Sequence, residues 1–450
     1  MKFLLTFALC LTVAGVVLAT NTQTLTQVGG FQSASVTQTG TGNVSDIYQF
    51  TDNDGPQIST VIQNGTDNLA DVDQFQTGGG SNTPANTAYL EQQGTGNIGY
   101  QYQNAPGFNS GQDVEAYQIG TDNLVRQAIY LGYTESAFSY QRGTQNTASQ
   151  SVQGSHNHVE NIQFGMYNIA TQTINGTNNG YLSARIVIEQ HGENNTGYQS
   201  YMSGGFSHKN HGDIWQVGDD NYGHQFNAGR DYYSEIWQHG IANYAGIQST
   251  GDNNTANAHQ RGDRNSVRYG GFTGIYQRGD WNSNVATQTG NGNSYNSEQS
   301  GLGNAASIAQ VGDLNMSSEG NRWHTFTAPD PDVLVEMHER GIYQIGNGNA
   351  ARIASLGNRH QAAIDQRGNG NAGSIYQDDP TLNNWGANFS KIRQEGDGNA
   401  SSISATGRMN DAFNAQFGHN NSSTITQTGY GFFTEVYQSG NGNVSTVTQN

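Results

Sequence analysis

Two kinds of residue alternate along most of this chain with a period of two. After a recurring Asn, every second position holds a small, branched or amide residue, as in Asn371–Gln377 (NAGSIYQ) and Asn443–Gln449 (NVSTVTQ). Thr, Ser, Asp, Tyr and Arg fill the positions between them. This period indicates β-strands that bury one face and expose the other.

One motif, Gln-x-Gly-x-x-Asn, lies between these strands. It occurs nineteen times, whereas composition alone predicts about one match. Steps of 22 residues join Gln216, Gln238 and Gln260, and a step of 11 joins Gln277 and Gln288. The spacing predicts a two-armed coil of about 22 residues with a strand and a turn in each arm. Gly residues in the motif provide the positive φ that tight turns require.

A two-stranded arch cannot bury its inner face alone, whereas stacked arches can. We therefore expect an all-β fold, a two-sided, amyloid-like β-solenoid of stacked strand-turn-strand coils over residues 20–450. Coils about 4.8 Å apart would align the inward amides into hydrogen-bonded ladders. The amides that we expect to stack are Gln38, Asn43, Gln63, Asn68, Gln216, Asn221, Gln238, Asn243, Gln366, Asn371, Gln377, Gln438, Asn443 and Gln449.

The two exceptions to the repeat are a leader and several interruptions. Residues 1–19 begin with Lys2, continue as an apolar stretch and end in small residues, which is typical of a cleaved secretory signal. The single Cys10 lies in this segment, so the mature chain has no disulfide framework. The register breaks near residues 204–213, 317–341 and 378–390, where we expect loop insertions.

Composition excludes several classes of function. Only 33% of the 450 residues are hydrophobic and 12% charged, while 42 Gln, 52 Asn and 60 Gly make up about a third of the chain. Eighteen basic against 36 acidic residues argue against nucleic-acid binding. The sequence has no nucleophile elbow, Walker loop or dinucleotide fingerprint. We expect neither an enzyme nor a cofactor.

Metal binding is a weaker hypothesis. Gly218–Asn221 (GDDN) is similar to calcium-binding repeats, but Asp is also a good turn residue and the strict nonapeptide is absent. His156 with His158, and His208 with His211, have no matching Cys or third ligand at a useful spacing. Turn and surface roles are therefore favoured, and we expect no metal site.

Aromatic residues precede the motif Gln in seven coils. If the coils stack in register, these residues form an outward stripe, which includes Trp215, Trp237, Tyr276, Tyr343 and Tyr437. Such a stripe could bind polysaccharide through flat ring faces. We favour the alternative that the rings stack on each other across neighbouring coils. Ice binding would need a flat, uniform Thr array, which this mixed outer face does not provide.

The full repeat, Ser/Ala-x-Ile/Val-x-Gln-x-Gly-x-Gly-Asn-x-Ala/Ser-x-Ile/Val-x-Gln, resembles the curlin repeat. The resemblance runs from about Thr22 to Asn450 and is cleanest in residues 342–353, 364–377 and 436–449. It implies a bacterial protein that is secreted through an outer-membrane channel and seeded by a nucleator. It also implies polymerisation with itself and related curlin subunits into curli, the cell-surface amyloid fibres of biofilm. Gln366, Asn371 and Gln377 would then carry stacking and elongation.

Some positions depart from the repeat. Ser355 and Ala405 stand in Gln slots, His360 stands in an Asn slot, and the segment at Gln153–Gly154 is one residue short. The chain also has several times the repeats of the family's usual major subunit. Our leading hypothesis is a structural subunit of curli-like fibres. The alternative is a monomeric β-solenoid adhesin that binds carbohydrate or surfaces through the aromatic stripe.

Overall fold

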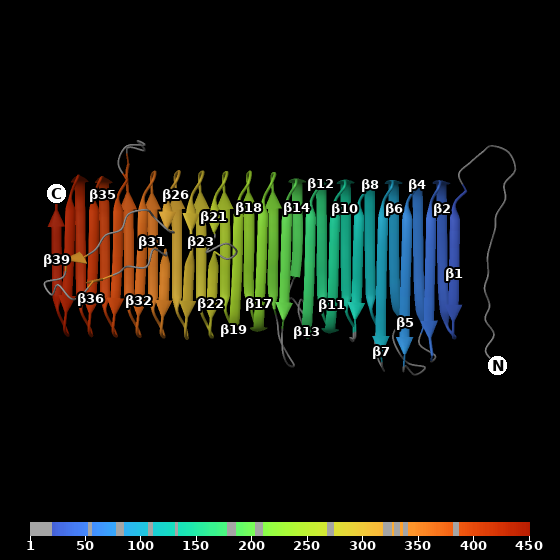
Figure 1. Cartoon of the computed structure of the whole chain (residues 1–450), viewed down its shortest axis with the longest axis horizontal. Coiled ribbons are helices and arrows are strands. Elements are labelled where there is room, and N and C mark those ends of the chain that lie inside the picture. The colour runs from blue at the N-terminus through green and yellow to red at the C-terminus, as the bar shows by residue number, and fades with distance from the viewer. Residues whose placement is uncertain are drawn as a thin grey trace. The chain divides into compact units, whose positions relative to one another are not determined.

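A computed structural model describes residues 20–450, apart from 53–55, 78–84, 107–110, 131–133, 178–185, 203–209, 268–273, 318–325, 328–333, 336–340 and 381–386. All the regular secondary structure in the described residues consists of β-strands (Figure 1), which confirms the all-β prediction. This part of the chain holds no helix long and apolar enough to cross a membrane. The predicted signal, residues 1–19, lies outside the described residues.

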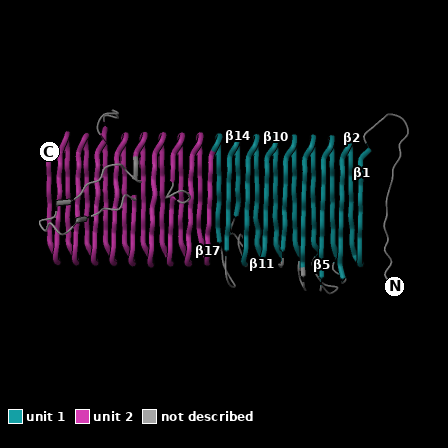
Figure 2. Tube along the Cα trace, viewed as in Figure 1, with its two compact units in different colours: residues 1–220 teal, residues 221–450 magenta. Residues whose placement is uncertain are grey.

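The chain divides into two compact units, residues 1–220 and 221–450 (Figure 2). In the first unit each coil gives one strand to each of two parallel sheets. Sheet 1 contains β1 (Thr22–Val28), β3 (Val44–Thr51), β5 (Leu69–Thr77), β7 (Ile98–Pro106), β9 (Leu124–Tyr130), β11 (Thr147–Ser155), β13 (Ile169–Thr177) and β15 (Thr196–Met202). Sheet 2 contains β2 (Gln32–Thr41), β4 (Gln57–Thr66), β6 (Asn86–Thr95), β8 (Asp113–Thr121), β10 (Ser136–Thr144), β12 (His158–Met166), β14 (Ile186–Glu193) and β16 (His211–Val217).

The second unit is built on the same plan, with some strands of its sheet 1 divided into two short pieces. Sheet 1 contains β17 (Tyr222–Arg230), β19 (Tyr244–Asp252), β21 (Ser266–Val267), β22 (Ile275–Arg278), β24 (Ser294–Tyr295), β25 (Ser297–Ser300), β27 (Met316–Ser317), β30 (Ile342–Ile345), β32 (Gln361–Arg367), β34 (Phe389–Glu395), β36 (Asp411–Phe417) and β38 (Phe433–Ser439). Sheet 2 contains β18 (Tyr233–His239), β20 (Thr255–Arg261), β23 (Ser283–Thr289), β26 (Ala305–Val311), β31 (Ala350–Leu356), β33 (Ala372–Asp378), β35 (Ala400–Arg408), β37 (Ser422–Tyr430) and β39 (Val444–Gln449).

Equivalent positions of the repeat pair across neighbouring coils, as a solenoid requires. Gln38 pairs with Gln63, and Gln63 with Gln92, in parallel register. In the first unit the stacked glutamines of neighbouring coils are 22 to 29 residues apart in the sequence. The predicted coil length of 22 residues is therefore the shortest that occurs there. Because the extra residues fall between strands, the alternation of buried and exposed side chains continues unbroken along each strand.

Branched residues fill the space between the two sheets. Ile47, Val61, Val72 and Leu90 are at most 1% exposed in the first unit, where they belong to one continuous apolar cluster. The same inward slot is filled by Ile353, among others, in the second unit. These residues supply the hydrophobic part of the core, and the motif Gln and Asn lie near the ends of the strands.

The predicted insertions are shorter than the sequence indicates. Residues 203–209 lie outside the description, but Asn210 is fully buried and β16 begins at His211, so residues 210–213 belong to a coil. Similarly, β33 extends to Asp378 and β34 begins at Phe389, which leaves a smaller interruption than 378–390. Within 317–341, β28 (Phe326–Thr327) pairs with β29 (Leu334–Val335) in antiparallel orientation.

The motif Gly is required by the neighbouring coil as well as by its own backbone. Gly368 has φ +114°, and a Cβ placed there would lie 2.1 Å from the carbonyl oxygen of Gly396 in the next coil. Two positions on, Gly370 has φ +64° but no atom within 4 Å of such a Cβ. The equivalent turn position is Asp220 or Arg359 in other coils, also with positive φ.

We therefore expect Gly368→Ala to lower the free energy of unfolding by about 3 kcal/mol, because the backbone of the next coil must move. Gly370→Ala is the matched control and is expected to cost about 1 kcal/mol, the ordinary penalty for Ala in the left-handed region. Urea denaturation of both variants measures the difference. Equal losses would show that coil spacing does not depend on the motif Gly.

Candidate assembly interface

Glutamine side chains form a continuous ladder along sheet 2 of the first unit. Gln38 Nε2 donates to Gln63 Oε1 at 2.7 Å, and Gln63 donates to Gln92 at 2.8 Å. The same bond recurs from coil to coil until Gln216. Each amide donates to the coil that follows it in the sequence, so the ladder has a direction. We call this a forward ladder.

The second unit has forward ladders in both sheets. In sheet 2 Gln238 donates to Gln260 at 2.9 Å, and at the far end Gln427 donates to Gln449 at 3.1 Å. In sheet 1 the same bond joins Gln277, Gln299, Gln344, Gln366, Gln394, Gln416 and Gln438 in turn. The motif glutamines are therefore shared between both arms in this unit, as the 11-residue spacing predicts.

Asparagine side chains at the turns form ladders of the opposite direction. Asn68 Nδ2 donates to Asn43 Oδ1 of the preceding coil at 2.9 Å and to the carbonyl of Gly94 in the following coil at 3.0 Å. In the second unit the same backward bond runs from Asn243 to Asn221 at 3.0 Å. Each turn Asn thus connects three successive coils.

The remaining predicted asparagines follow the same rule. Asn371 Nδ2 donates to Asn349 Oδ1 at 3.2 Å and to the carbonyl of Gly396 at 2.8 Å, and Asn443 donates to Asn421 at 2.9 Å. Leaving a buried polar group unpaired costs about 1–3 kcal/mol, and the ladders avoid this cost in coil after coil. The predicted amides accordingly lie inside their coils, and all are buried except Gln38, Asn443 and Gln449, which are partly buried.

The departures from the motif are accommodated locally. Ser355 Oγ donates to Gln377 Oε1 at 3.1 Å, while Ala405 offers no partner and Gln377 Nε2 bonds to the carbonyl of Gln361 at 2.9 Å. His360 is fully buried, and burial lowers its pKa. The neutral ring donates from Nε2 to the carbonyl of Leu356 at 2.9 Å. Its Nδ1 accepts from the Asn388 backbone at 3.2 Å.

Sheet 1 of the first unit holds a forward ladder through Gln27, Gln49, Gln74 and Gln103 and a further ladder that is missing from the sequence prediction. This further ladder occupies an inward position nearer the middle of sheet 1 and joins Gln101, Gln127, Gln150, Gln172 and Gln199. Beside it the usual Gln slot holds Ile129, Val152 and Ile174, so Gln153 points outward, one position beyond the slot. Each Gln residue of the further ladder follows a turn Asn by four positions. An even separation from an inward Asn predicts an inward side chain, so the sequence does contain the signal for this ladder.

The predicted aromatic stripe is not a single stripe. Trp215 lies on β16 of the first unit and Trp237 on β18 of the second, both in sheet 2. The other members, Tyr276, Tyr343 and Tyr437, lie on β22, β30 and β38 in sheet 1. The prediction failed because the motif Gln does not stay in one arm in the second unit. It lies in sheet 2 at Gln238 and in sheet 1 at Gln344 and Gln366, and the two sheets face opposite ways.

Rows of aromatic rings that the sequence prediction did not include run across the first unit. On sheet 1 the ring centroids of Tyr48, Phe75, Tyr102 and Tyr130 follow one another at 5.3, 5.6 and 5.3 Å. On sheet 2 the ring centroids of Tyr89 and Tyr117 are 5.2 Å apart. Contact between rings of neighbouring coils is therefore real, and it includes two residues of the predicted stripe. The ring centroids of Tyr437 and Phe417 are 5.5 Å apart, and those of Trp237 and His259 are 6.3 Å apart.

The turn carboxylates and histidines have structural partners. Asp219 Oδ1 accepts from the Glu193 backbone at 2.9 Å, and Asp263 Oδ1 accepts from the Ile241 backbone at 2.9 Å. His158 lies 2.9 Å from Glu160, while His208 lies outside the described residues. No group of three or more His, Cys, Asp or Glu side chains within the described ranges could hold a metal ion.

One turn slot holds a buried acid. Glu135 is 1% exposed, and its Oε1 accepts a hydrogen bond from Asn157 Nδ2 at 3.1 Å. Burial raises the pKa of Glu135 from 4.5 to about 8, against the smaller opposing effect of the Asn157 hydrogen bond. The side chain is therefore mostly protonated at neutral pH. Its Oε1 accepts as an amide oxygen would, while its Oε2 has no hydrogen-bond partner among the described residues.

Comparison of the chain with protein-family models and with curated proteins finds no match. The arrangement of the side chains themselves must therefore support any functional conclusion.

We expect Glu135→Gln to raise the free energy of unfolding by about 3 kcal/mol at pH 7, because Gln needs no proton to occupy the slot. The folded-state pKa is raised, so the contribution of Glu135 is complete below pH 4.5 and is lost as pH rises toward 8. At pH 4 the variant should match the parent. Urea titrations at both pH values test this, and an unchanged pH dependence would contradict it.

Proposed function

We propose that this chain is a secreted structural subunit of extracellular, curli-like functional amyloid fibres. It polymerises end to end and contributes to biofilm matrix and surface adhesion. The direction of the ladders is the observation that carries the proposal. Because the Gln amides donate forward and the turn Asn amides donate backward, the first and last coils present complementary groups.

The first coil has an acceptor to offer. Gln38 Oε1 is buried and has no hydrogen-bond partner among the described residues, since Gln38 itself donates forward. Within the described strands, β1 pairs only with β3, and β2 only with β4. Their outer edges therefore carry unpaired backbone groups, which are a template for another strand.

The last coil has the matching donors. Gln438 and Gln449 accept from Gln416 and Gln427 in the preceding coil, so the next step of each ladder lies beyond β38 and β39. If the register continues, Gln438 of one molecule meets Gln27 of another, and Gln449 meets Gln38. A contact between two different surfaces that does not close on itself generates a filament.

The partners of this function are proposed on the curlin resemblance alone. They are an outer-membrane secretion channel, a nucleator, related curlin subunits and extracellular polysaccharide. Nucleic acid is not among them, because the formal charge of −18 opposes phosphate binding.

A thioflavin-T time course on residues 20–450, diluted from denaturant and followed by electron microscopy, tests the proposal. We expect a lag, unbranched fibres and loss of the lag when preformed seeds are added. A soluble, β-rich chain that stays unchanged for days would contradict polymerisation and favour the adhesin.

In the same assay we expect Gln366→Ala and Asn371→Ala to slow seeded elongation roughly tenfold or more, because each breaks a ladder and leaves neighbouring amides unpaired. Tyr376→Ala is the control, since this side chain is 38% exposed and points outward from β33, the strand that follows Asn371. Its elongation rate should stay within about twofold of the parent. Equal effects of all three changes would show that the inward amides do not control growth.

A further inference from the structure

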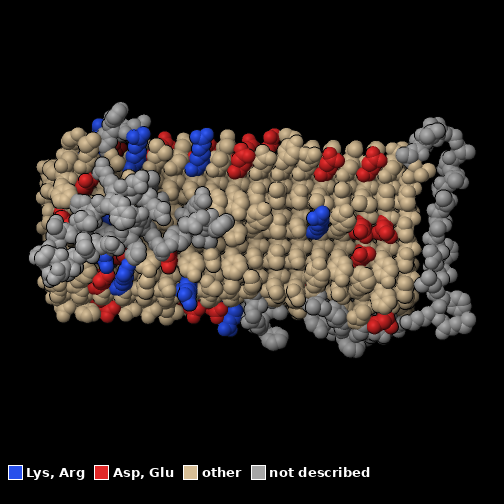
Figure 3. Space-filling view, viewed as in Figure 1, with Lys and Arg blue, Asp and Glu red and all other residues tan. Residues whose placement is uncertain are grey.

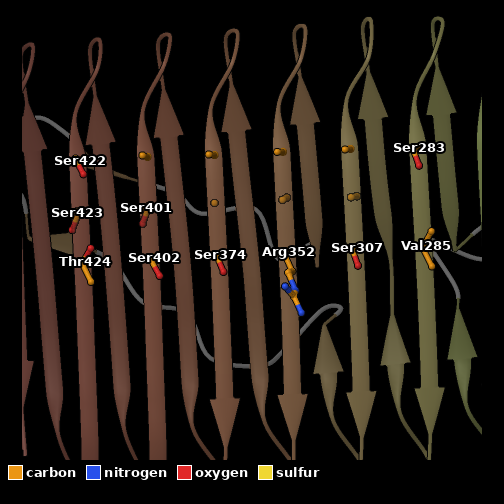
Figure 4. A pocket seen from close by; sticks show the side chains of 17 residues that line it. Ser283, Val285, Ser307, Arg352, Ser374, Ser401, Ser402, Ser422, Ser423 and Thr424 are labelled. Carbon is orange, nitrogen blue, oxygen red and sulfur yellow. The ribbon is translucent and has the colours of Figure 1, made fainter.

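The outer face of sheet 2 in the second unit carries an open groove that crosses six strands, β23, β26, β31, β33, β35 and β37 (Figure 4). Its volume is about 440 Å³, and small residues such as Ala350, Ala372, Ala400 and Ser402 line it. Because small residues recur in register over these coils, the groove runs along the stacking direction and has the same repeat as the coils.

One charged side chain, Arg352, stands among the described residues that line this groove. It is exposed, and its register neighbours are Ser307 and Ser374. No ion pair joins it to any residue in the described part of the chain. A neutral groove with one unpaired guanidinium suits a partner that presents a narrow apolar ridge and a carboxylate.

The first unit presents such a ridge on sheet 1, formed by Tyr48, Phe75, Tyr102 and Tyr130. The centroid separations of 5.3 to 5.6 Å are close to the spacing of adjacent strands. Neighbouring rings are tilted by 39° to 43° to each other and contact one another in series, so they form a ridge along the stacking direction.

Carboxylates flank this ridge. Asp46 pairs in register with Asp71, and Tyr48 with Asp73. Burial and the neighbouring carboxylates raise the pKa of both Asp71 and Asp73, and none of the three has a cation partner within the described ranges. Figure 3 shows acidic side chains gathered on one part of the face of the first unit. Arg126 lies in the same register row, two strands from Asp71, and its guanidinium is over the Tyr100 ring.

We propose that two copies of this chain associate side by side, with the aromatic ridge of one copy seated in the groove of the other and Arg352 placed between Asp71 and Asp73. Ridge and groove both repeat with the strand spacing, so contacts stay in step along the stack. The opposite charges fix the position of one copy along the other.

A second copy fits these surfaces better than a polysaccharide chain does. Sugar rings stack on exposed aromatic faces, whereas here each ring contacts the tilted ring of a neighbouring coil. The groove is about 25 Å long on the strand spacing, so one contact is smaller than the roughly 800 Å² per partner of a stable interface. Single chains should therefore associate weakly, while fibres that repeat the contact should form bundles; the bundling rests on the proposed function.

Charge reversal provides the test. One chain carries Arg352→Glu, and a second carries Asp71→Lys with Asp73→Lys. Sedimentation velocity at high concentration measures lateral association of soluble chains, electron microscopy measures bundle width, and thioflavin-T growth is followed separately. Arg142→Glu is the matched control, because Arg142 is an exposed strand residue outside the groove.

We expect each reversed chain alone to lose lateral association roughly tenfold, because like charges then meet. An equal mixture should recover to within about threefold of the parent, since both mixed contacts pair opposite charges. The proposal is overturned if the parent shows no lateral association in either form, if the reversed chains associate normally, or if mixing restores nothing. Normal fibre growth without bundling would contradict the lateral contact but not the proposal of end-to-end polymerisation.

Discussion

Hydrogen bonding between amides of successive coils is the interaction on which the rest of this structure depends. An inward Gln or Asn has its partner at the spacing of one coil, so coils must stack in strict register. That register in turn brings the Gly396 carbonyl to where a Cβ of residue 368 would lie, and it places rings such as Tyr48 and Phe75 in contact. Corner glycines and outer aromatic rows are thus consequences of the ladders.

The sequence predicts much of this because period-two alternation and the Gln-x-Gly-x-x-Asn spacing both report directly on backbone geometry. The substituted slots at Ser355 and His360 are found where expected, and both are buried. The predictions fail where position depends on counting through an interruption. Trp215 and Tyr276 belong to one stripe only if every motif lies in the same arm, yet they lie on different sheets. The inward ladder through Gln127 contains no motif Gln, so the motif alone does not predict it.

The ladders also separate two kinds of surface. The edges of β1, β2, β38 and β39 carry directional amides and unpaired backbone groups, which suit growth by addition of identical chains. The outer faces carry side chains that take no part in the core. They form a small-residue groove in one unit and an aromatic ridge in the other. Elongation and lateral contact can therefore change independently, because their side chains point to opposite sides of the same strands.

Growth through continued ladders is the central claim, and it is tested most directly at the junction between two molecules. Fibres grown from an equal mixture of ¹⁵N-labelled and ¹³C-labelled chains allow solid-state NMR to detect only intermolecular contacts. We predict a contact between the side-chain amide nitrogen of Gln438 and the side-chain carbonyl carbon of Gln27. Fibres that lack this contact, or that pair these strands in another register, would contradict the account.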